Sequence, residues 1–192
     1  MKTFKYNKLL SLIFFLLTLV LILFFMTQDF YNWAFNRHHN KWSWYIRPLF
    51  LIPFSYFAYK RNIFGVSIVI FLLLTSMFWF SAPEVLEKQV EEFLLFEKEW
   101  LQSKWSFTKL ISLLAIPISL FLLALAFWKR SLYLGLAVII LMIIGKVIWS
   151  LQNAGASSFA IILPAIIGLM SCVILIIIGH RKLINKEISN KN

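Results

Sequence analysis

The sequence predicts an all-α integral membrane protein: a bundle of six transmembrane helices with an extracytoplasmic amphipathic helix. Three observations lead to this fold class. The 192 residues are 61% hydrophobic and only 14% charged, too little charge for the surface of a soluble domain of this size. The apolar residues form long blocks, without the period of a strand or of an amphipathic helix. Short charged segments separate the blocks and leave no length for a soluble domain.

Six apolar blocks approach the length that a helix needs to cross a bilayer, roughly 20 residues. They are residues 9–26, 44–59, 63–80, 107–128, 131–149 and 156–179, and we treat residues 1–192 as one membrane domain. The first block follows three lysines and resembles a secretory signal. It is too long for one and lacks a small-residue cleavage site, which favours an uncleaved signal anchor.

The second block is marginal, because Arg47, Pro48 and Pro53 interrupt it and it could enter the membrane without crossing. Charge counting decides between the two topologies, since Lys and Arg in short loops stay in the cytoplasm. With six spans, eleven basic residues fall inside and five outside, whereas without this span six fall inside and eleven outside. The sequence therefore predicts a multi-pass protein of the cell membrane with both termini in the cytoplasm.

Two connections outside the cytoplasm are long enough to hold structure. Residues 27–43 are dense in aromatic side chains, which suits a segment in the head-group layer. The other connection begins with Ser81, Pro83 and Glu84, the pattern of a capping box, and predicts a helix over residues 82–101. The apolar and acidic residues of this helix fall on different faces, so we expect it to rest on the bundle or on the membrane.

The acidic face of this helix has two interpretations. Lipid head groups are commonly anionic, so Glu84, Glu87 and Glu91 are better placed against the outer cations of the protein itself, and the helix would then cap the bundle. Alternatively, the acids are solvated and the cations only extend to the interface. The candidates for ligand binding or ion pairing are Lys146, Arg47, Arg37 and Lys109.

Lys146 and Arg47 lie within apolar blocks, where an ionisable side chain usually has a partner or a function. We expect Lys146 to contact Glu84, Glu87 or a backbone carbonyl at an outward pocket lined by Trp79 or Trp149. The preceding glycine, at position 145, would let another backbone come close.

Arg47 precedes Pro48, whose ring disrupts a helix and frees backbone groups for other partners. Arg47 then either lines an outward cavity for an anionic group or anchors a short helix at the head groups. Small residues at 160, 164, 168 and 172 recur every four positions of the last block and predict close helix packing.

Catalysis and metal binding have only weak candidates. His38 and His39 could serve as acid or base with Glu84 or Glu87. The same two histidines are adjacent and lack the spacing of known zinc motifs, so we expect no metal site. No glycine-rich phosphate loop is present and no cofactor is expected.

The net charge of +11 is spread over turns and tails, so the lipid bilayer is the expected partner and nucleic acid is not. The leading hypothesis is a small non-enzymatic membrane protein that handles a ligand or a membrane-protein partner at its outer face, as a transporter-like carrier or a subunit of an assembly. The alternative is a membrane-embedded enzyme that acts on a lipid-linked substrate at the outer leaflet.

Overall fold

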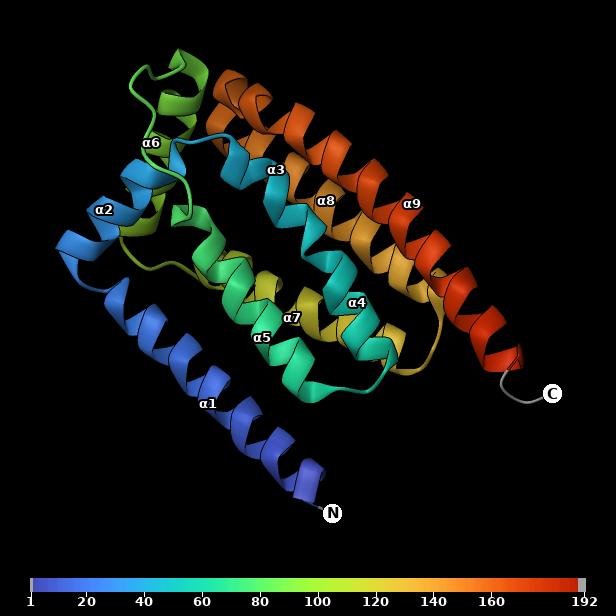
Figure 1. The fold of residues 1–192 in the computed structure, drawn as a ribbon. Coiled ribbons are helices and arrows are strands. Elements are labelled where there is room, and N and C mark those ends of the chain that lie inside the picture. Colours follow the sequence, from blue (N-terminus) through green and yellow to red (C-terminus); the bar gives the residue numbers. More distant parts are fainter. Residues whose placement is uncertain (1, 190–192) are drawn as a thin grey trace.

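The computed structural model describes residues 2–189, and every regular element in that range is helical, as the sequence predicts. The helices pack into an elongated bundle (Figure 1). The elements are α1 (Lys2–Phe24), α2 (Gln28–His38), α3 (Trp42–Leu49), α4 (Leu51–Tyr59), α5 (Ile63–Thr75), the 3-10 turn η1 (Ser76–Phe78), α6 (Lys88–Gln102), α7 (Phe107–Trp128), α8 (Leu132–Ala154), the 3-10 turn η2 (Gly155–Ser158) and α9 (Phe159–Ser189).

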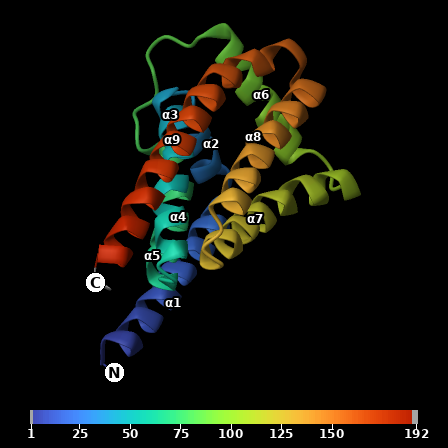
Figure 2. The same cartoon turned by 90° about the vertical axis from the view of Figure 1, so that its right-hand side faces the viewer.

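The connections between the long helices gather at two ends of the bundle. At one end, which we call the capped end, α2, α6 and η2 lie across the helices (Figure 1). At the other, the turn end, turns at residues 60–62 and 129–131 join α4 to α5 and α7 to α8. The start of α1 and the end of α9 both lie on the side of the turn end (Figure 2).

Three stretches of the described residues are long and apolar enough to cross a membrane, fewer than the six spans that the sequence predicts. They are Asn7–Phe24, Phe107–Trp128 and Leu132–Leu183. The third is 52 residues long and contains α8 and most of α9, which are separated at Gly155, where φ is +57°. The predicted span 44–59 is divided into α3 and α4, and the predicted span 63–80 yields only the shorter apolar helix Ile63–Phe78.

Proline explains why α3 and α4 are separate helices. Pro53 has no N–H to donate to the carbonyl of Leu49, the last residue of α3. The neighbouring carbonyl of Pro48 accepts a hydrogen bond from the Cys172 thiol of α9 at 2.8 Å. Gly168 makes room for the Pro48 ring, which a Cβ at that glycine would strike. The small residues of α9 therefore form a packing face, as predicted, and that face receives α3.

The two turns at the turn end have the same backbone design. Arg61 and Arg130 adopt the left-handed conformation, with φ of 55° and 58°. The following residues, Asn62 and Ser131, donate their backbone N–H groups back to the preceding helix, as in a Schellman motif. Their side chains accept from N–H groups in the first turn of the next helix. Local backbone capping therefore suffices to define both turns.

Each turn also contacts the other. Arg61 donates from Nε to the carbonyl of Trp128 at 3.3 Å. In the opposite direction, the Arg130 guanidinium lies 5.1 Å from the centroid of the Tyr59 ring. Arg61 thus contacts the last residue of α7, and Arg130 contacts the last residue of α4. The two turns therefore hold each other through equivalent contacts.

Helix α6 begins at Lys88, so the prediction of a helix from residue 82 with a capping box at Ser81 and Glu84 is wrong. The preceding segment is irregular because Arg37 of α2 and Asn40, which lies between α2 and α3, hold its backbone. Arg37 donates from Nε to the carbonyl of Phe78 at 2.7 Å, and Asn40 donates from its amide to the carbonyl of Ser81 at 2.9 Å.

The amphipathic character predicted for α6 is confirmed. Its apolar face covers the capped end, where Val90, Phe93 and Leu94 are at most 2% exposed. These side chains pack with Tyr31 and Phe35 of α2 and with Trp44 of α3. The helix therefore caps the bundle and brings the Glu97 carboxylate to Lys146 of α8.

Candidate functional site

Glu97 of α6 is the centre of a polar cluster at the capped end. It lies one turn after Phe93 and Leu94, on the face of α6 that turns toward the bundle. Its carboxylate pairs with the ammonium of Lys146 on α8 at 2.5 Å. The ammonium also lies 4.9 Å from the Trp149 ring and 5.5 Å from the Phe93 ring. Two aromatic rings and a carboxylate thus contact this cation, which stays half exposed.

The prediction that Lys146 contacts Glu84 or Glu87 is wrong. The lysine does contact a glutamate of the capping helix beside Trp149, but that glutamate is Glu97 and neither Glu84 nor Glu87. Gly145 has nothing within 4 Å of the place where a Cβ would stand, so the expected close approach of another backbone at this glycine is also wrong.

His38 of α2 lies beside the Arg47 side chain of α3 and is 5% exposed. Arg47 has only donors, so its Nη1 donates to Nε2 of His38 at 3.1 Å. The other ring nitrogen, Nδ1, lies 3.0 Å from the Ser43 hydroxyl, and the Trp44 indole N–H donates to the His38 carbonyl at 3.0 Å. One arrangement satisfies all these groups: a neutral imidazole that carries its proton on Nδ1 and donates it to Ser43.

Electrostatics keep this histidine neutral. Burial lowers the pKa of His38 well below its usual value, and the positive charges of Arg47 and Lys146, with His39, lower it further. Burial raises the pKa of Tyr31 to about 12, and the negative charge of Glu97 contributes to this rise. The same carboxylate attracts the positive charge of Arg47. We call Tyr31, His38, Arg47, Glu97 and Lys146 the polar cluster.

The other two predicted ligand candidates satisfy backbone carbonyls. Arg37 donates to the Phe78 carbonyl and lies 5.3 Å from the Trp33 ring. Lys109 is only 3% exposed and donates to the carbonyls of Leu101 and Ser103, both at 2.7 Å. Lys109 therefore caps the C-terminal end of α6, where carbonyl groups lack helical partners.

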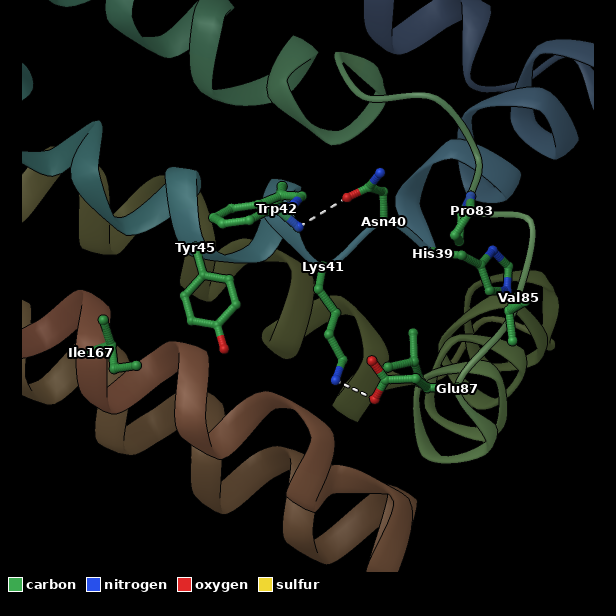
Figure 3. Close-up of a pocket in the computed structure, with 10 residues that line it drawn as sticks. His39, Asn40, Lys41, Trp42, Tyr45, Pro83, Val85, Glu87 and Ile167 are labelled. Atoms are coloured by element: carbon green, nitrogen blue, oxygen red, sulfur yellow. Dashed lines mark hydrogen bonds and ion pairs between the residues drawn. The ribbon is translucent and has the colours of Figure 1, made fainter.

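A pocket of about 650 Å³ opens at the capped end (Figure 3). It lies between the start of α3, the segment before α6, and α9. Lys41 and Tyr45 extend into it, and Lys41 pairs with Glu87. The lining residues are His39, Asn40, Lys41, Trp42, Tyr45, Pro83, Val85, Glu87, Val90 and Ile167. A mostly apolar wall with a few polar groups is typical of a small-molecule site.

The structure brings two of the four residues proposed for acid–base work, His39 and Glu87, to one pocket and leaves the other two outside it. His39 and Glu87 line the same pocket, and Nδ1 of His39 donates to the Phe35 carbonyl at 2.9 Å. His38 does not line the pocket, and Glu84 is exposed without a hydrogen bond or ion pair to the described residues. Among the described residues, no group of three or more His, Cys, Asp or Glu side chains could hold a metal ion.

Sequence reasoning missed Glu97, Lys41 and Tyr45. A signal for Glu97 was present, because it continues the apolar stripe of residues 90, 93 and 94, where a carboxylate needs a partner. Lys41 and Tyr45 carry no such signal, since their surroundings come from the distant segment before α6 and from α9. Comparisons with protein-family models, with curated proteins and with solved structures found no match to this chain.

Proposed function

We propose that this chain is a six-span protein of the cell membrane that binds an amphipathic ligand at its outer face without transforming it. The pocket between α3 and α9 is the observation that carries this proposal. It offers the Tyr45 hydroxyl, the Lys41 ammonium and His39 to a polar group, and Trp42 and Ile167 to an apolar one. A ligand or part of a membrane-protein partner with both characters would satisfy both walls.

Six crossings follow if the shorter helices act in pairs. Only Phe50 separates α3 from α4, and the two continue along one line in Figure 1. Helix α5 continues into η1, and α8 and α9 are separate helices on either side of Gly155. An even number of crossings agrees with the start of α1 and the end of α9 at the same end. The basic turns at Arg61 and Arg130 favour a cytoplasmic turn end and an outward capped end.

The bundle between the two ends supports binding rather than passage. Its core is apolar and centres on α4, where Phe54 and Ala58 are at most 1% exposed. They pack with Val69, Leu123 and Ile139 of three neighbouring helices. A route for a polar solute would need polar groups along this core. The pocket opens beside α9 instead, at the level of Ile167, which suits entry from the membrane.

Cysteine labelling tests the orientation on which the proposal rests. Single cysteines replace Gln89 in the first turn of α6, Lys60 in the turn between α4 and α5, and Lys129 in the turn between α7 and α8. All three positions are exposed. An impermeant maleimide added to intact cells should label only the cysteine at 89. The native Cys172 is fully buried and provides a silent background. Labelling at 60 or 129 in intact cells would overturn the orientation.

The binding step is tested by filling the pocket. Ile167→Trp places an indole where α9 borders the pocket, and Ile166→Trp is the matched control, because Ile166 is exposed on α9 but does not line the pocket. Native mass spectrometry of the protein released from mild detergent should show a bound molecule in the wild type and in the control. The same mass retained by Ile167→Trp, or lost from both variants, would contradict the proposal.

One observation favours the enzymatic alternative, the presence of His39 and Glu87 in the same pocket. General acid–base catalysis needs such groups near one transferred proton. Glu87 already pairs with Lys41, so its carboxylate is engaged by another side chain of the pocket. His39→Gln and Glu87→Gln would abolish turnover of a lipid-linked substrate if the pocket were catalytic. They would only weaken binding if it were not.

A further inference from the structure

The pocket at the capped end holds one cation and one carboxylate on opposite walls. Lys41 directly precedes α3, and its ammonium extends toward the carboxylate of Glu87, the last residue of the segment before α6 (Figure 3). Among the described residues that line the pocket, no other is a Lys, Arg, Asp or Glu. The pocket therefore offers a ligand one positive and one negative charge, which pair with each other in the structure.

This ion pair is exposed enough for a ligand to open it. The Lys41 side chain is 36% exposed and the Glu87 side chain 63%. Ion pairs with such exposure contribute little to stability, because water solvates both charges. Glu87 has extended backbone angles and its side chain makes no capping hydrogen bond to α6. The two charges can therefore separate without the loss of a helix.

The wall formed by the start of α3 suits an anion. Tyr45 follows Lys41 by one helical turn, and its backbone N–H donates to the Lys41 carbonyl at 3.3 Å, so the two side chains share one face. The Tyr45 hydroxyl extends into the pocket and makes no hydrogen bond to the described residues (Figure 3). An ammonium has three donors, of which Glu87 accepts one. A phosphate, with several acceptor oxygens, could accept from both side chains.

The opposite wall requires a cation in the same ligand. Within the part of the chain that the structure describes, Glu87 pairs only with Lys41. A ligand with an anion alone would take Lys41 and leave Glu87 unpaired, and a ligand with a cation alone would do the reverse. A zwitterion pairs with both residues at once. An unpaired charge in the pocket thus selects against ligands of a single charge.

The rest of the pocket favours a zwitterion that carries a hydrocarbon chain. Val85, Val90 and Ile167 line it, and Val85 is 84% exposed, so an apolar group has side chains to cover. Ile167 lies about 12 Å along α9 from its first residue, Phe159, at the rise of an α-helix. This stretch of α9 is apolar enough to cross a membrane. A head group at the end of α9 would therefore have its chain directed along α9 into the bilayer.

We propose that the pocket at the capped end binds the head group of a zwitterionic phospholipid from the outer leaflet. Lys41 and Tyr45 bind the phosphate, Glu87 binds the ammonium group, and an acyl chain follows α9 past Ile167. The two charges of the lipid replace the ion pair between Lys41 and Glu87. This inference rests on the proposed function, which it deepens by naming the class of ligand.

The test compares three probes with one acyl or alkyl chain of equal length. They are lysophosphatidylethanolamine, which is zwitterionic, lysophosphatidylglycerol, which is anionic, and a cationic alkylamine. Native mass spectrometry measures their binding to the full chain, purified and delipidated in a maltoside detergent. The wild type should bind the zwitterion about tenfold or more tightly than either other probe. Glycerophosphoethanolamine, the same head group without a chain, should bind far more weakly, and equal binding would overturn the assignment to a lipid.

Single neutralising variants should change which probe is preferred. Glu87→Gln leaves only the cation in the pocket and should shift the preference about tenfold toward the anionic probe. Lys41→Gln leaves only the carboxylate and should shift it equally toward the alkylamine. Glu84→Gln and Lys88→Gln are the matched controls, because both residues are exposed near Glu87 but do not line the pocket. They should keep the order of the wild type.

Ile167→Trp separates the failure of this inference from the failure of the proposed function. If that variant binds all three probes as the wild type does, the pocket is not the site and both proposals are wrong. If it loses the probes, but Glu87→Gln and Lys41→Gln rank them as the wild type does, the proposed function stands. The assignment to a zwitterion would then be overturned.

Discussion

The capped end and the turn end both carry many charged residues, but they hold them in different ways. At the capped end, the Glu97 side chain is 18% exposed and pairs with Lys146, from a distant part of the chain. At the turn end, Arg61 occupies an exposed turn that backbone capping defines.

The two ends therefore differ in whether a charged side chain can be removed without loss of stability. A carboxylate that pairs with a lysine from another helix, and whose charge also acts on a buried arginine, cannot be removed without leaving those cations uncompensated. A charge on a capped turn can be removed at little cost, because the backbone already satisfies its own hydrogen bonds. We therefore expect stability to depend on charge at the capped end and on backbone conformation at the turn end.

The largest effect is expected for Glu97→Gln. This change leaves Arg47 and Lys146 without their shared carboxylate and should lower the free energy of unfolding by about 2–4 kcal/mol, less than a fully buried pair because Lys146 is half exposed. Glu87→Gln is the control, since its pair with Lys41 is more exposed and should cost at most about 1 kcal/mol. Denaturant unfolding in detergent measures both. Equal losses would remove the distinction between the two pairs.

The pH dependence of stability gives the next largest effect. The pKa of His38 is lowered in the folded protein, so below about pH 6.5 the unfolded chain binds a proton that the folded chain excludes. The contribution of His38 is complete above that pH and decreases by up to about 1.4 kcal/mol for each unit that the pH falls.

Measuring the free energy of unfolding of the wild type and of His38→Gln would give this contribution. The measurements should cover roughly pH 4 to 8, the range over which a histidine titrates. The variant retains the two other histidines, so the difference between the profiles isolates His38. Parallel profiles would show that folding leaves the pKa of His38 unchanged, which would contradict the lowered pKa of the buried imidazole beside Arg47.

Helix positions were largely readable from the sequence, because they depend on local patterns. The helix predicted at 107–128 is α7, Phe107–Trp128, whose first turn is capped by Ser106. The start of α6 was misread, because Ser81 and Glu84 form a local capping pattern while the bonds that hold this segment come from Asn40 and from α2. Hydrogen bonds from distant residues therefore outweighed the local capping pattern.

The candidate site was readable only in part, for the same reason. Lys146 and Arg47 stood out as charges in apolar blocks, and both belong to the polar cluster. The bond between Arg47 and His38 joins α3 to α2, and a linear pattern does not show which ring nitrogen faces which donor. The pocket at the capped end joins the start of α3 to Ile167, more than a hundred residues away, so sequence patterns could not reveal it.

The smallest effect is expected at the turn end, for Arg61→Gly. The arginine has φ of 55°, a left-handed conformation that costs a residue with a Cβ about 1 kcal/mol and that glycine adopts freely. The change also loses the hydrogen bond to the Trp128 carbonyl, which at 3.3 Å on an exposed side chain is worth about 0.5 kcal/mol. The two effects oppose each other, so the free energy of unfolding should stay within about 1 kcal/mol of the wild type. Denaturant unfolding under the conditions used for Glu97→Gln gives the comparison. A loss as large as that of Glu97→Gln would mean that the contact between the two turns, and not backbone capping, holds the turn end together.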